Sequence, residues 1–169
     1  MTADELIKQF GMAPHPEGGF WVRSSIALPP HPAWSAIYFL LRRDDISRLH
    51  VLTADELWLA HGPTPVELIQ IFPDGSLKRS FLGLDITKQQ VPQITITTGT
   101  IFGARVLPLA ADATATPAPH DDYALMSCLV IPAFTDECFT LCDREELLQR
   151  FPSHAQTIRD FTPNIDTKP

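Results

Sequence analysis

The segment 14–19 places an imidazole and a carboxylate two residues apart on a nearly predetermined backbone. Prolines at positions 14 and 16 flank His15, and Glu17 is followed by two glycines. Each proline fixes its own φ and pushes the preceding residue out of the α region, so an extended His15 shares one side of the chain with Glu17. We therefore predict that His15 and Glu17 bind a ligand. A stiff surface turn is the alternative, because proline and glycine are common in turns.

A second imidazole and carboxylate, His50 and Glu56, lie on consecutive strand-like runs, with Trp58 two residues further on. The even spacing allows all three side chains, together with Leu52, to project into one cavity. A buried charge costs several kcal/mol or more unless it is paired, so the two groups would share a proton, bind a ligand or open to water. The alternative is a pair of solvated residues at the rim.

The elements that would position these residues are mostly short strands. Ten β-rich runs are separated by turn residues, and no helical pattern lies between them, which favours an antiparallel sandwich or barrel. The runs are 20–25, 36–41, 48–52, 57–60, 66–72, 77–81, 93–97, 101–106, 125–130 and 138–141.

Helical signals are confined to the two ends of the chain. Thr2 and Glu5 form a capping box before an apolar stripe that Gly11 ends, and Asp143 with Glu146 repeats the pattern near the C-terminus. A further helical turn or two is expected after Pro152. The segment 109–122, rich in Ala, Thr and Pro, is either a lid or a disordered loop, and we favour disorder.

Composition indicates one globular domain, which we place at residues 1–162 with a C-terminal tail at 163–169. The chain has 169 residues, of which 44% are hydrophobic and 20% charged. Its net charge of −7 and lack of basic clusters argue against nucleic acid as a partner. No apolar run is long enough for a membrane span, and no signal peptide is recognisable. Three cysteines without a CxxC motif fit a reducing compartment, so we expect a cytoplasmic protein with no membrane partner.

Several of these motifs resemble those of the cupin superfamily. The run from His50 through Glu56 to Gly62 is similar to the first cupin motif, in which two histidines and a glutamate on a small jelly-roll barrel hold a metal ion. A degenerate second motif lies at 97–102. Five segments in order look like the cupin family of uncharacterised function called DUF985 (cupin_5), and together they cover nearly the whole chain: 14–21, 36–41, His50 with 55–58, 82–85 and 128–134.

The resemblance implies an all-β fold, a double-stranded β-helix (RmlC-like jelly-roll barrel) with short N- and C-terminal helices, commonly assembled as a homodimer. It also implies a metal site, from which this chain departs. Leu52 and Phe102 stand where the second and third histidines of a metal-binding cupin are expected. Zinc and iron sites use three or four protein ligands, so His50 and Glu56 alone would hold an ion weakly.

A metal would therefore need a further ligand from elsewhere in the chain. The candidates are His15, Glu17 and His61. We expect no cofactor, with a divalent transition metal as the less favoured alternative.

Three functions remain open at this stage. The first is binding of a small polar molecule, sugar- or nucleotide-like, without catalysis. Trp58 and Phe102 would stack on it, and the imidazoles and carboxylates of His15, Glu17, His50 and Glu56 would supply hydrogen bonds.

The second is a metal-independent sugar or nucleotide-sugar epimerase or isomerase, an activity that the cupin resemblance suggests. His50 and Glu56 would abstract and return a proton beside a carbonyl, and Tyr38 would act as the acid across the substrate. Tyr38 is otherwise a core aromatic residue. The third is a structural role, with the cavity filled by Trp58, Leu52 and Phe102.

Overall fold

A computed structural model describes residues 1–26, 33–107 and 122–163 of the chain. The predictions for the segment 109–121 and for the tail beyond residue 163 lie outside the described residues. The elements within them are α1 (Ala3–Phe10), β1 (Ala13–Pro14), β2 (Phe20–Ile26), β3 (Ser35–Arg42), β4 (Ile46–Leu52), β5 (Asp55–Pro63), β6 (Val66–Ile71), β7 (Leu77–Leu82), β8 (Gln93–Ile96), β9 (Ile101–Val106), β10 (Tyr123–Ile131), β11 (Phe139–Leu141), α2 (Arg144–Arg150) and α3 (Ala155–Asp160), with short 3-10 turns at Ile86–Lys88, Asp136–Cys138 and Pro152–His154.

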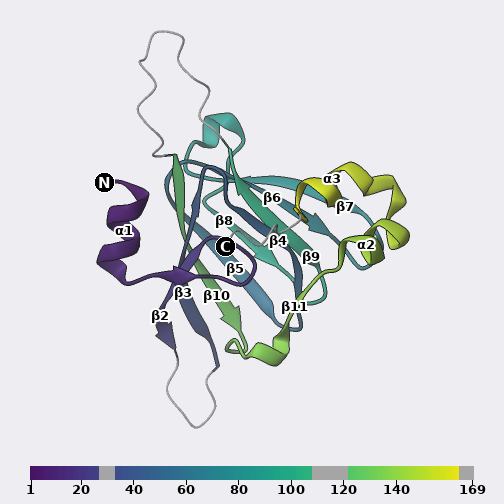
Figure 1. Cartoon of the computed structure of the whole chain (residues 1–169), viewed down its shortest axis with the longest axis horizontal. Helices are drawn as coiled ribbons and strands as arrows, with labels where there is room; N and C mark the ends of the chain where they lie inside the picture. The colour runs from purple at the N-terminus through teal and green to yellow at the C-terminus, as the bar shows by residue number, and fades with distance from the viewer. Residues whose placement is uncertain (27–32, 108–121, 164–169) are drawn as a thin grey trace, which may run out of the picture.

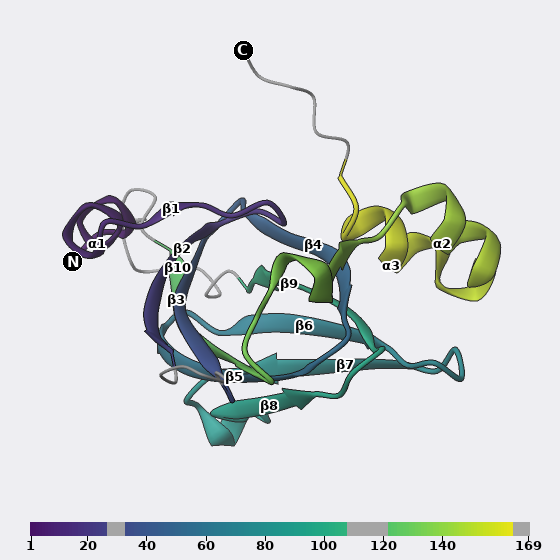
Figure 2. The same ribbon diagram turned by 90° about the horizontal axis from the view of Figure 1, so that it is seen from below.

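Two antiparallel sheets face each other and curve around a common interior (Figure 1, Figure 2). The six-stranded sheet has the order β1-β2-β3-β10-β5-β8, and the five-stranded sheet has the order β11-β4-β9-β6-β7. All ten predicted strands are present, and the predicted double-stranded β-helix is confirmed. Strand β1, which pairs with the start of β2, was not predicted.

Helices cover the outer face of each sheet. Helix α1 contributes Leu6 to a cluster with Leu40 of β3 on the six-stranded sheet, and α2 and α3 lie against the five-stranded sheet through Leu147 and Ile158 (Figure 2). The predicted capping box of α1 is formed, since the Glu5 N–H donates to Thr2 Oγ1 at 3.1 Å and the Thr2 N–H donates to Glu5 Oε2 at 2.9 Å. Within the described part of the chain, no helix is long and apolar enough to cross a membrane.

The interior between the sheets is filled at one end and hollow at the other. Strand β10 shows the change, because its inward residues Ala124 and Met126 are packed in the core whereas Cys128 and Val130 line a cavity. The start of β3, the start of β5 and the end of β10 therefore lie side by side at the hollow end.

The chain passes from one sheet to the other between His50 and Glu56. Strand β4 belongs to the five-stranded sheet and β5 to the six-stranded sheet, with residues 53–54 between them. The crossing is held by the Thr53 N–H, which donates to the Cys138 carbonyl at 2.9 Å, and by the Thr98 N–H, which donates to Asp55 Oδ1 at 2.8 Å. His50 and Glu56 consequently approach the interior from opposite walls.

Candidate binding site in the barrel

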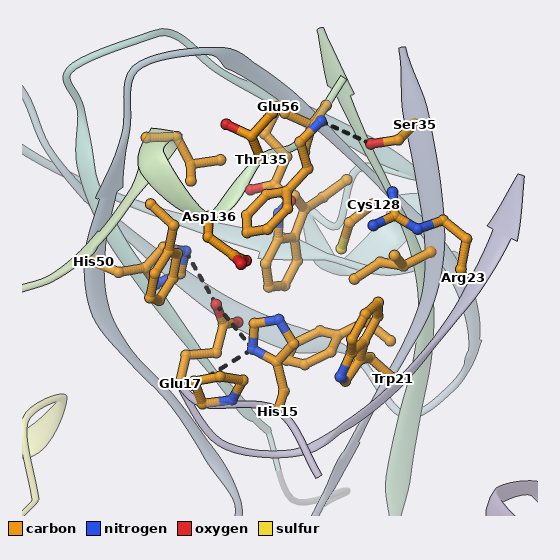
Figure 3. A pocket seen from close by; sticks show the side chains of 18 of the residues that line it. His15, Glu17, Trp21, Arg23, Ser35, His50, Glu56, Cys128, Thr135 and Asp136 are labelled. Atoms are coloured by element: carbon orange, nitrogen blue, oxygen red, sulfur yellow. Dashed lines mark hydrogen bonds and ion pairs between the residues drawn. The ribbon is translucent and has the colours of Figure 1, made fainter. Parts of the chain in front are cut away.

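A cavity of about 560 Å³ lies at the hollow end of the barrel (Figure 3). Most of its wall is aromatic or aliphatic, and a small set of polar side chains interrupts that wall. Five of the seven predicted site residues line it: His15, Glu17, His50, Glu56 and Trp58. Both imidazole–carboxylate sets proposed from the sequence thus meet in one space.

The segment 14–19 is both a stiff turn and part of this site, so the two alternatives for it are compatible. The His15 N–H donates to the Gly19 carbonyl at 2.9 Å, and the Gly18 N–H donates to the His15 carbonyl at 3.0 Å. Gly18 and Gly19 have φ values of 120° and 72°, and a Cβ at Gly18 would collide with the Ile46 carbonyl. Glycine is therefore required where the turn packs against β4.

Glu17 is the centre of a buried hydrogen-bonded group, and only 5% of its surface is exposed. Ser47 donates its hydroxyl to Glu17 Oε1 at 2.7 Å, and the other carboxyl oxygen, Oε2, lies 3.3 Å from His50 Nε2 and 3.5 Å from His15 Nδ1 (Figure 3). The partner of His50 is thus Glu17, 33 positions earlier in the sequence, and not the nearby Glu56. Sequence spacing carries no signal for such a contact, and Ser47 was missed altogether.

The contacts of His50 indicate which of its ring nitrogens carries a hydrogen. His50 Nδ1 lies 2.7 Å from the Arg48 carbonyl oxygen, which can only accept, so Nδ1 carries a hydrogen. Burial lowers the pKa of His50 to about 4 and raises the pKa of Glu17 above its ordinary value. The His50 imidazole is therefore neutral near pH 7, and its Nε2 lone pair is directed at Glu17.

His15 lies on the other side of the Glu17 carboxyl group. Burial lowers its pKa, although the nearby Glu17 carboxylate opposes the change. The Glu17 N–H donates to His15 Nδ1 at 3.4 Å, which leaves the ring hydrogen on Nε2. The Glu17 carboxyl group thus lies between two imidazoles whose pKa values are both lowered by burial.

Glu56 approaches from the opposite sheet and is 7% exposed. Burial, with a further contribution from Glu17, raises the pKa of Glu56 to about 8. Its Oε2 and the neighbouring Trp58 Nε1 make no hydrogen bond of normal geometry within the described residues, although the Trp58 N–H is close enough to Glu56 to oppose part of the rise in its pKa. Cys128 lies beside them, and burial raises the pKa of its thiol well above the ordinary value, so it is a poor nucleophile.

The mouth of the cavity carries charged side chains. Arg23 projects from β2, with its guanidinium 5.9 Å from the centre of the Trp21 ring, and Asp136 and Glu137 project from the 3-10 turn that follows β10. Trp21 was not predicted as a cavity residue, although its even spacing from Arg23 was a usable signal.

The structure corrects the placement of Tyr38. Its neighbours Ile37 and Phe39 line the cavity, so the alternation of β3 turns Tyr38 to the outer face, where it stacks on Phe10 at 5.3 Å between ring centres. His61 lies on that face too, with Nε2 2.6 Å from Ser127 Oγ and its ring 6.2 Å from that of Tyr38. Tyr38 is thus not placed to act as an acid across a substrate.

Phe102 is also misplaced in the sequence-based prediction. It is fully buried, does not line the cavity, and packs behind His50 with 4.0 Å between ring centres. The aromatic rings that do line the cavity include those of Trp21, Trp58 and Phe139.

The residues present do not fit the metal centre that the cupin resemblance implies. Leu52 lines the cavity and Phe102 lies beside His50, so two positions expected to hold histidines supply no donor atom. Among the residues that the structure describes, no group of three or more His, Cys, Asp or Glu side chains is arranged to hold a metal ion. The expectation of no cofactor stays a prediction.

Comparison with known proteins agrees with this architecture. The family model described as "Cupin superfamily (DUF985)" matches residues 4–142. A crystal structure of a protein from Shewanella oneidensis is 34% identical, with a TM-score of 0.84 over 96% of this chain and 98% of that one. A hypothetical protein from Leishmania major is 27% identical, with a TM-score of 0.83 over 97% of this chain and 100% of that one.

A more distant relative shows the fold alone. A cupin 2 conserved barrel domain protein from Rhodopseudomonas palustris is 17% identical, with a TM-score of 0.57 over 91% of this chain and 92% of that one. A search of curated proteins found no match. Because the family model spans most of the chain and two solved structures match it nearly end to end, this chain belongs to the DUF985 family of the cupin superfamily.

Proposed function

We propose that the protein binds a small polar molecule, of sugar or nucleotide size, in the barrel cavity. The observation that carries this proposal is the Glu56 carboxyl group, which is buried, borders the cavity and has an oxygen without a partner among the described residues. A buried polar atom left unpaired costs about 1–3 kcal/mol, and a ligand that pairs with it would recover that free energy. The cavity volume of about 560 Å³ suits such a ligand.

The remaining wall supports the same conclusion. Hydrogen-bonding groups come from the segment 14–19, from β4 and from β5, while aromatic rings supply flat apolar surface between them. Glu17 is held by Ser47 and His50, so these groups need little rearrangement on binding. A few fixed polar groups in an apolar cavity are typical of small-molecule sites.

The test is a thermal-shift screen of sugars, nucleosides, nucleotides and nucleotide sugars, followed by titration calorimetry on the hits. A true ligand stabilises the folded protein by mass action. The Glu56→Leu variant fills the same space without polar atoms, and we expect it to bind a hit at least about tenfold more weakly, because a hydrogen bond to a buried group is lost.

The matched control is Tyr38→Phe, which removes a hydroxyl from the outer face. Equal affinities for wild type and Glu56→Leu would refute a role for Glu56 in binding. A panel without any hit would favour the structural alternative.

A metal-independent epimerase or isomerase is the second candidate, favoured by one observation. His50 Nε2 lies 3.3 Å from the Glu17 carboxyl group, and Glu56, with a pKa of about 8, is an acid available at neutral pH. Glu56 would take the place assigned to Tyr38. Binding ranks first because both ring nitrogens of His50 face protein groups, Nδ1 the Arg48 carbonyl and Nε2 Glu17, and because an imidazole with a pKa of about 4 is a weak base at neutral pH.

Solvent exchange tests this candidate. A substrate incubated in deuterium oxide would gain deuterium at the carbon that loses its proton, and His50→Gln should abolish this gain. Exchange that continues unchanged in His50→Gln would exclude His50 as the base.

A further inference from the structure

Arg23 is a cation at the cavity mouth that the proposed function does not yet use. It is exposed and lines the cavity together with the Trp21 ring beneath it (Figure 3). Strand β2 sets this direction, because Arg23 pairs with Ile37 and Trp21 with Phe39, and both partners also line the cavity. The register therefore points the guanidinium towards the site.

No carboxylate of the described residues forms an ion pair with Arg23. By contrast, Arg42 pairs with Asp4, Arg43 with Asp122, and Arg105 with Glu67. Glu137, at the same mouth, has its pKa lowered by hydrogen bonds from its own backbone N–H and from the Thr135 hydroxyl. The Arg23 guanidinium thus keeps its donors available at the entrance.

We propose that the ligand is a small organic anion, whose carboxylate or phosphate group binds Arg23 while its ring-shaped body lies against Trp21 and reaches towards Glu56. This inference rests on the proposed function and names the ligand class. A guanidinium binds either anion through parallel hydrogen bonds, and an aromatic ring below it supplies a flat surface for the body of the ligand.

The inner wall is compatible with such an anion. Burial raises the pKa values of Glu17 and Glu56, which lessens the negative charge that the interior presents to an anion, whereas Asp136 and Glu137 place two carboxylates at the mouth. The chain as a whole carries a net charge of −7, which disfavours anions at a distance. Arg23 is the single arginine or lysine among the described residues that line the cavity, so binding of an anion would depend on its guanidinium.

Matched pairs of compounds test this directly by titration calorimetry. The pairs are ribose with ribose 5-phosphate, uridine with uridine 5′-monophosphate, and benzamide with benzoate. We expect the anionic member of at least one pair to bind about tenfold more tightly or better, and Arg23→Gln to remove that advantage. Because Arg23 is exposed, the advantage should also shrink in 0.5 M salt.

Arg23→Lys separates the two kinds of anion. A lysine keeps the charge but loses the planar fork, so it should preserve phosphate binding better than carboxylate binding. Lys78→Gln is the charge-matched control, since Lys78 is exposed on β7 and does not line the cavity. It should leave all affinities unchanged.

Three outcomes would overturn the inference. If the neutral compounds bind as tightly as the anionic ones, the ligand is not selected for its negative charge, although binding in the cavity still stands. An anionic advantage unchanged in Arg23→Gln would place the anion elsewhere. No binding by any compound, including the panel used above, would overturn this inference together with the proposed function.

Discussion

Raising the pH should destabilise the protein through Glu56, and replacing Glu56 by glutamine should remove that loss. Burial raises the pKa of Glu56 from its ordinary value of 4.5 to about 8 in the folded protein. Between these two pH values the folded chain keeps a proton that the unfolded chain has released, so the free energy of unfolding falls as the pH rises. At about 1.4 kcal/mol per pH unit, the full loss is at most about 5 kcal/mol, reached above pH 8.

His50 acts in the opposite direction in acid. Burial lowers its pKa from 6.5 to about 4, so the unfolded chain binds this proton first and stability is lost as the pH falls between those values. The largest contribution is about 3 kcal/mol. The two effects on the free energy of unfolding oppose each other between pH 4.5 and 6.5. Above pH 6.5 the effect of Glu56 continues without that of His50.

Urea unfolding at pH 5, 6, 7, 8 and 9 measures the effect. The free energy of unfolding of Glu56→Gln minus that of wild type should increase by about 4 kcal/mol between pH 5 and pH 8, and then level off. Glu146→Gln, at an exposed position on α2, is the control and should follow the wild-type profile. A difference between Glu56→Gln and wild type that stays constant across this range would refute the assignment of a buried, protonated Glu56.

Three further predictions concern the same site, and one concerns the outer face. Glu17→Gln should cost less than about 1 kcal/mol of stability because burial, which raises the pKa of Glu17, favours an uncharged group there, whereas Glu17→Ala should cost about 2–3 kcal/mol. Gly18→Ala should cost about 2 kcal/mol or more, because the strain of a positive φ adds to a collision of the new Cβ with the backbone. Gly99→Ala should cost only about 1 kcal/mol, because its φ of 76° is strained for alanine but a Cβ there would meet no other atom. Tyr38→Phe should leave ligand affinity unchanged in calorimetry. Elemental analysis should find well below one transition metal per chain.

Each of these has a result that contradicts it. A loss of about 3–5 kcal/mol in Glu17→Gln would indicate a buried ion pair instead of a neutral one. Equal costs at Gly18 and Gly99 would mean that the close approach to β4 does not matter. Weaker binding in Tyr38→Phe would place that hydroxyl in the site, and one metal per chain that disappears in His50→Ala would establish a metal centre.

Much of the fold followed from local patterns. The ten strands are bounded by turn residues, and the helix starts carry caps at Thr2 and Asp143 that satisfy backbone N–H groups wherever the helix finally packs. Strand β1 escaped prediction because two residues are too few to show an alternation. The placement of Tyr38 failed because alternation tells which residues share a face of a strand, but not which face is inside.

The sequence alone determined the strand-rich core and the rigid turn at 14–19, and its even spacing predicted that His50 and Glu56 face one space. These are consequences of backbone stereochemistry and of a two-residue period, which act over a few neighbouring positions. Only the tertiary structure decided that Glu17 contacts His50, that Ser47 donates a hydrogen bond to Glu17, and that Arg23 lies at the mouth of the cavity. Those contacts join segments far apart in the chain, so they depend on sheet register and on burial, which in turn decides which groups carry a proton.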